Sequence, residues 1–134
     1  MKKYILSLAV IIIVVLILIA IGSVYLSPKE NERLSEKTTK GSVAELFGQK
    51  YDRPADTVII EIGNDTGSFA KGTVRFADEF GGGVWFAAKT VQGWELAFDG
   101  NGIVSCAAAN KYDFPRDMIP QCLDTQNGNK LIER

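Results

Sequence analysis

Two cysteines, Cys106 and Cys122, are the residues whose type and spacing most directly indicate a reaction. No third cysteine competes for either thiol. In an oxidising compartment such a pair forms a disulfide, whereas two buried thiols are the alternative in the cytoplasm. We expect the disulfide, which by chain entropy contributes about 3 kcal/mol to stability. The expected bridge places this part of the chain outside the cytoplasm.

A second candidate group consists of Lys89, Trp85 and Trp94. A hairpin with its turn at Gln92 and Gly93 places all three on one otherwise apolar face. Such a face could bind a ligand, with Lys89 supplying one charge. The alternative is that the tryptophans are core beneath a helix and that Lys89 lies at the rim. That alternative is favoured, because so small a domain has little other apolar mass.

Several kinds of catalytic or metal site are disfavoured. The chain has no histidine, which is the commonest metal ligand and the usual base of hydrolytic triads. Residues 99–102 read Asp-Gly-Asn-Gly like the start of a calcium loop, but Asn110 stands where the bidentate carboxylate belongs, so a tight turn is predicted. The glycines at 81–83 lack the lysine and hydroxyl pair of a phosphate loop. We therefore predict no enzyme activity, no cofactor and no metal.

Residues 4–26 form an apolar run without one charge, preceded by Lys2 and Lys3. A hydrocarbon core about 30 Å thick needs roughly 20 such residues in helical form. The alternative is a signal peptide cleaved before Ser23, but signal sequences have apolar runs of about 7 to 15 residues. We expect an uncleaved membrane anchor over residues 1–26. Lysines and arginines on both sides of it leave its orientation ambiguous, and the expected disulfide decides for an outside domain.

The rest of the chain divides into a polar tether, residues 27–40, and a small domain, residues 41–134. We expect the tether to be irregular, since Pro28 and the lack of an apolar stripe disfavour a helical stalk. Outside the anchor there are 13 basic and 16 acidic residues, a net charge near −3. This balance disfavours a nucleic-acid partner.

The predicted domain is of α+β class, with one helix on an antiparallel sheet of four or five strands and a disulfide-stapled carboxy-terminal segment. Ser42 and Glu45 have the spacing of a capping box, which predicts that the helix starts there. Strands are expected over 57–62 and 68–76, joined by a loop in which Gly67 is left-handed. That loop pairs Ile62 with Ala70 and sets Glu61 opposite Lys71.

A second predicted hairpin joins residues 84–91 to residues 94–98. Its expected register pairs Val91 with Trp94, Lys89 with Leu96 and Ala87 with Phe98. Residues 103–105 are expected to add a short edge strand. The polar tail after residue 124 is expected to fray.

Three stretches near the carboxy terminus read GGGVWFAAKTVQGWELAFDGNGIVSC, YDFPRDMIPQC and GNKLIER. They resemble a group of small uncharacterised bacterial membrane-anchored proteins. The shared layout is an anchor, a polar tether, and a domain with a tryptophan-rich hairpin, a DGNG turn and two cysteines. The likeness itself covers roughly residues 42–134. The resemblance implies no activity.

The expected function is therefore a non-catalytic binding or structural role at the cell envelope. The chain would be a single-pass protein of the cell membrane, with that membrane and an envelope protein as partners, and the sequence leaves a small-molecule ligand unknown. One alternative is a pilin-like filament subunit, although the chain lacks a leader ending in glycine and a glutamate within the apolar run. The other is a small envelope enzyme that works without histidine.

Overall fold

The computed structural model describes residues 12–15 and 28–134. Residues 12–15 are helical, with side chains about half exposed. None of the described helices is both long and apolar enough to cross a membrane. Apart from these four residues, the anchor predicted over 1–26 lies outside the described part. The chain divides into two units, Met1–Leu34 and Ser35–Arg134, and the sheet and both hydrophobic cores belong to the second.

Helix α2 (Pro28–Tyr51) starts well before the predicted cap. The prediction of a helix start at Ser42 is wrong, and residues 28–40 are helical rather than irregular. Proline is favoured in the first turn of a helix, where its missing amide proton has no partner to lose. Glu36 precedes Lys40 by four residues, a spacing that stabilises helices. These local preferences outweigh the absence of an apolar stripe.

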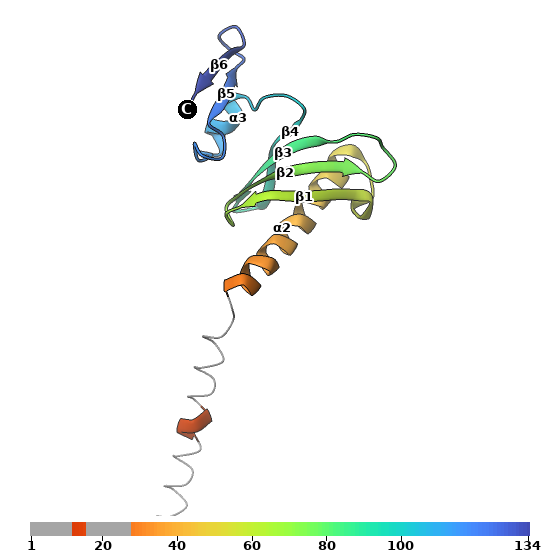
Figure 1. Cartoon of the computed structure of the whole chain (residues 1–134), viewed down its shortest axis with the longest axis vertical. Helices are drawn as coiled ribbons and strands as arrows, with labels where there is room; N and C mark the ends of the chain where they lie inside the picture. The colour runs from red at the N-terminus through yellow and green to blue at the C-terminus, as the bar shows by residue number, and fades with distance from the viewer. Residues whose placement is uncertain (1–11, 16–27) are drawn as a thin grey trace, which may run out of the picture. The chain divides into compact units, whose positions relative to one another are not determined.

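Four antiparallel strands form the main sheet in chain order, which confirms the α+β class (Figure 1). They are β1 (Val58–Asp65), β2 (Phe69–Phe76), β3 (Gly83–Thr90) and β4 (Gly93–Gly100), and a short 3-10 turn, η1 (Ala55–Thr57), leads into them. The predicted fifth strand over 103–105 is wrong. Of those residues, Ser105 alone makes a bridge, to Leu123.

Both hairpin registers differ from the predicted ones by two residues. Ile60 pairs with Val74, and a bulge follows Ile62, so Glu61 lies opposite Thr73 instead of Lys71. In the second hairpin Lys89 pairs with Trp94, because the turn lies one residue earlier than expected. Side chains alternate with a period of two, so such a shift keeps nearly every residue on its predicted face. The alternation of polar and apolar residues therefore predicted the face of the sheet on which each residue lies, but not which residues pair across strands.

Phe98 does not lie on the face of the sheet that was predicted for it. A bulge between Phe86 and Ala87 brings Phe98 opposite Phe86, away from the face that carries Ala87. A bulge inserts one unpaired residue into a strand and so changes the face of those beyond it. The two phenylalanine rings lie edge to face, with centroids 6.3 Å apart.

The first core lies between α2 and one face of the sheet. Val43 and Phe47 of α2 pack there with fully buried residues of three strands: Ile60, Ala70, Trp85 and Ala87. Gly72 permits this packing, because a Cβ there would lie 1.9 Å from the Glu61 carbonyl oxygen and 2.9 Å from the Trp85 ring. The buried Trp85 indole donates a hydrogen bond to the Thr73 carbonyl at 3.0 Å. Helix and sheet thus pack as predicted.

A second core lies on the opposite face of the sheet, beneath the carboxy-terminal segment. That segment contains α3 (Cys106–Lys111), β5 (Gln121–Asp124) and β6 (Lys130–Glu133). Its buried side chains meet Ala88 of β3, and they are Val104, Ala109, Phe114, Met118, Ile119 and Cys122. The segment therefore covers part of a face that the sequence had left open.

The predicted disulfide between Cys106 and Cys122 is confirmed, and it joins α3 to β5 across a Cα–Cα distance of 4.8 Å. The prediction of a frayed tail is wrong, since β6 pairs with β5. At the last residue, the Arg134 guanidinium donates to the carbonyls of Ile119 and Phe114 at 3.2 and 3.1 Å. These bonds close the segment on itself.

Replacing both cysteines by serine should lower the free energy of unfolding by about 3 kcal/mol and the melting temperature by several degrees. We expect the loss of stability to be concentrated in the carboxy-terminal segment, because the disulfide lies in the second core. Hydrogen exchange should lose protection over residues 104–134 before it does so in α2 and β1–β4. The reduced wild-type chain is the matched control and should behave like the variant. Equal melting temperatures of the oxidised wild type, the reduced wild type and the serine variant would contradict a stabilising role of the disulfide.

Candidate binding groove

A cavity of about 520 Å³ opens on the face of the sheet opposite α2. Its floor consists of Lys71 and Thr73 of β2 with Val84 and Phe86 of β3. The chain at 102–104 forms one wall, and residues 119–121 with Leu131 form the other. We call this cavity the sheet groove. It is the part of the outer face that the carboxy-terminal segment leaves uncovered.

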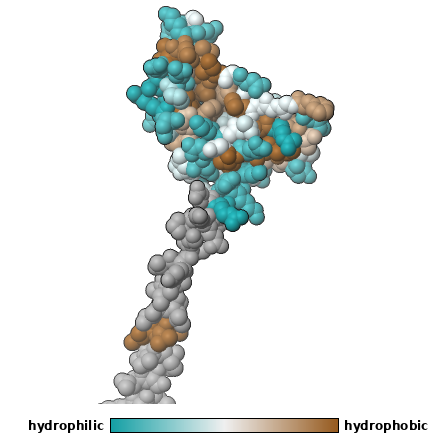
Figure 2. Space-filling view, viewed as in Figure 1, coloured by the Kyte–Doolittle hydropathy of each residue, from teal (hydrophilic) through white to brown (hydrophobic). Residues whose placement is uncertain are grey.

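The sheet groove is mainly apolar. Val84, Ile103 and Leu131 line it, and they are 39%, 50% and 51% exposed. Figure 2 shows exposed apolar residues among polar ones in the region of β5 and β6. Scattered apolar side chains are normal on protein surfaces, but a cluster around a cavity is typical of a binding site.

A smaller cavity of about 300 Å³ adjoins the sheet groove and shares Thr73 and Val84 with it. It adds Glu61, Arg75 and the glycines at 81–83 to the lining. The Thr73 hydroxyl donates to the Glu61 carboxylate at 3.3 Å. The outer face thus combines an apolar groove with a polar extension.

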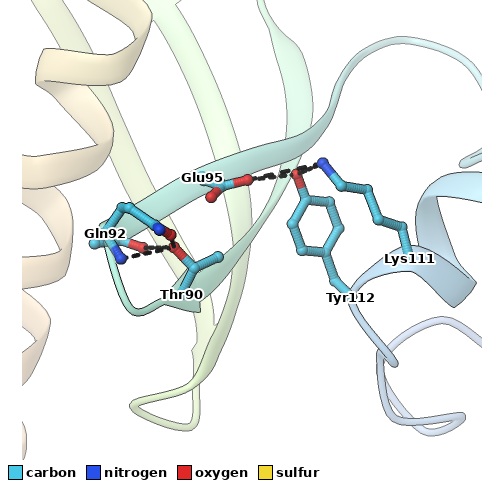
Figure 3. Close-up of polar contacts among 6 residues, drawn as sticks. Thr90, Gln92, Glu95, Lys111 and Tyr112 are labelled. Atoms are coloured by element: carbon cyan, nitrogen blue, oxygen red, sulfur yellow. Dashed lines mark hydrogen bonds and ion pairs between the residues drawn. The ribbon is translucent and has the colours of Figure 1, made fainter.

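The wall of the sheet groove is held against the sheet by hydrogen bonds. The Lys71 ammonium donates to the Met118 carbonyl at 3.2 Å. A second link joins Glu95 of β4 to the end of α3, as Figure 3 shows. There the Tyr112 hydroxyl donates to Glu95 at 2.9 Å and accepts from the Lys111 ammonium at 2.8 Å.

This polar link shifts the acidity of its members. The hydrogen bond from Tyr112, aided by Thr90 and by the charge of Lys111, holds the pKa of the Glu95 carboxyl below its usual value. The same tyrosine raises the pKa of Lys111. Both shifts favour the charged forms, so the link is strongest at neutral pH.

Of the sequence-predicted site residues, Trp85 borders the sheet groove, whereas Lys89 and Trp94 are not among its lining residues. Trp85 is fully buried and Trp94 is 9% exposed, both in the core beneath α2, while Lys89 is exposed beside Trp94. The structure brings the two tryptophans together but offers them little open surface. The groove was missed because it uses the alternate positions of β3, Val84 and Phe86. Apolar residues on both faces of a strand are a signal for burial on both sides.

Other polar residues, among them Asp99 of the DGNG turn, link parts of the fold. The Asp99 carboxylate of the DGNG turn accepts hydrogen bonds from Lys50 and Tyr51 of α2, which raises the pKa of Tyr51. Arg53 forms ion pairs with Asp78 and Glu79, at 2.6 and 2.7 Å. Within the described residues, no cluster of three or more acidic or cysteine side chains could hold a metal ion.

Comparisons with family models, curated proteins and solved structures found no match to this chain. The resemblance noted from the sequence therefore stays an expectation.

Replacing Tyr112 by phenylalanine should raise the pKa of Glu95 toward its usual value. Because the folded-state pKa is depressed, the link stabilises the fold above the ordinary carboxyl pKa and is lost as the pH falls through the folded-state value. The variant should thus be less stable at pH 7, and its deficit should shrink below about pH 4. NMR titration of the carboxyl and denaturation at each pH measure both effects. Tyr51→Phe is the matched control and should leave the Glu95 titration unchanged. A shifted Glu95 pKa in Tyr51→Phe, or an unshifted one in Tyr112→Phe, would contradict the assignment.

Proposed function

We propose that this chain is a membrane-tethered domain outside the cytoplasm that binds a ligand without catalysis, and that the sheet groove is its binding site. The observation that carries the proposal is the apolar groove on the outer face of the sheet, with Val84, Ile103 and Leu131 exposed in it. Among the described residues that line it, Lys71 is the one side chain with a titrating group. Such a lining favours binding over acid–base chemistry.

Two further features support the location. The apolar run over residues 4–26 is long enough for an anchor, and the disulfide is typical of an oxidising compartment. The resemblance to small bacterial membrane-anchored proteins agrees with both. The proposal thus places the groove at the cell envelope, held close to a membrane surface.

Site-directed crosslinking tests the groove directly. We expect p-benzoylphenylalanine at Val84, inside the groove, to form defined adducts with envelope components when the full chain is irradiated in its native membrane. The same probe at Val91, which is 97% exposed on the β3–β4 turn, is the matched control and should not form them. Identical adducts at both positions, or none at Val84, would contradict a binding groove.

Thiol labelling tests the location of the domain. In a Val91→Cys variant the native cysteines are paired, so the new thiol is the one that reacts. A membrane-impermeant maleimide should label it in intact spheroplasts as fully as in lysed ones. Labelling after lysis alone would place the domain inside the cytoplasm.

A further inference from the structure

The backbone of the sheet groove floor has no free hydrogen-bonding groups to offer a ligand. The floor belongs to β2 and β3, and both are central strands paired on each side. A peptide brings an amide donor and a carbonyl acceptor with nearly every residue, and leaving these groups unpaired in an apolar site is costly. An acyl chain has no such requirement. The floor therefore favours a hydrocarbon occupant over a peptide.

Two cations of β2, which lie on either side of Thr73 on the outer face, indicate the other end of the ligand. Lys71 lines the groove and Arg75 lines the adjoining cavity. Neither forms an ion pair with a carboxylate in the described part of the chain. The nearby anion, Glu61, already accepts a hydrogen bond from Thr73. Two cations and one anion give this region a positive local charge, whereas the chain outside the anchor has a net charge near −3.

We propose that the sheet groove binds the single acyl chain of an anionic lipid from the envelope membrane, with Lys71 and Arg75 binding its head. This inference rests on the proposed binding function and adds the ligand class. The apolar lining supplies affinity in proportion to the area it removes from water. The two cations select the sign of the head, since an amine head would be repelled by them.

A photoreactive fatty acid tests the ligand class. The full chain is placed in phosphatidylcholine nanodiscs with a twelve-carbon fatty acid that carries a diazirine on its chain, irradiated, and analysed by mass spectrometry. Adducts should map to Val84, Phe86, Ile103 and Leu131. The amine with the same chain should label these residues much less. Adducts spread over the domain, or equal labelling by acid and amine, would overturn the proposal.

Variants separate the roles of the two cations. Lys71→Gln and Arg75→Gln should each reduce groove labelling two- to fivefold, the range expected for exposed charge pairs. Lys89→Gln removes an exposed lysine from the other face of β3 and is the matched control, with no expected effect. Because Lys71 also holds Met118, Arg75→Gln is the cleaner test and amide exchange in β5 should verify the fold of both. Unchanged labelling in Arg75→Gln would overturn the assigned head site.

The outcome also distinguishes this inference from the proposed function. Specific protein adducts from the probe at Val84, without fatty-acid labelling, would show that the groove binds a partner but not an acyl chain. Absence of any Val84-specific adduct in native membranes would contradict the binding function itself.

Discussion

Strand β3 places large or buried side chains on both faces of the sheet, and the need to cover both faces determines the architecture. Trp85 and Ala87 belong to the core beneath α2, whereas Phe86 and Ala88 belong to the core on the other side. A strand that is apolar on both faces must be covered on both. One long helix covers the first face. The second face depends on whatever the remaining 34 residues after β4 can form.

Those residues form short elements that have little stability of their own. Helix α3 spans six residues, and β5 and β6 span four residues each. An isolated two-stranded hairpin is marginal in water, and so is a helix of under two turns. Covalent and polar links compensate: the Cys106–Cys122 bridge, the Tyr112–Glu95 contact, and the Arg134 bonds to backbone carbonyls. The cover remains partial, and the uncovered area between Val84 and Leu131 is the sheet groove.

The faces of the sheet could be predicted from the sequence, but the strand pairs could not. Alternating polarity assigned Ile60 and Trp85 to the helix side, since a wrong face would bury charge. Registers that differ by two residues preserve every face in a regular ladder, so polarity does not distinguish them. The choice depends on tertiary packing, such as that of Trp85 against Gly72, and on bulges after Ile62 and Phe86.

Local signals were present for the elements that the prediction missed. Pro28 and the acidic residues after it suit the start of a helix, but the prediction gave more weight to the missing apolar stripe. Gly128 and Asn129 have positive φ values of 82° and 57° in the turn between β5 and β6, and both residue types tolerate that region. The polar composition around them concealed a hairpin whose apolar residues are few. Nothing local revealed which face of the sheet the segment covers, because that contact joins residues far apart in sequence.

The sheet groove depends on its wall, and the wall is held by a disulfide of the kind that forms in oxidising compartments. The wall at residues 119–121 directly precedes Cys122, and the bridge to Cys106 fixes the strand that begins there. In a reducing compartment the wall would rely on its hydrogen bonds and on the packing of the second core, and a short hairpin held in that way opens at a lower free-energy cost. Oxidation removes much of that freedom, so the complete groove is expected to form where the disulfide does. The bond that stabilises the fold therefore also holds the wall of the sheet groove.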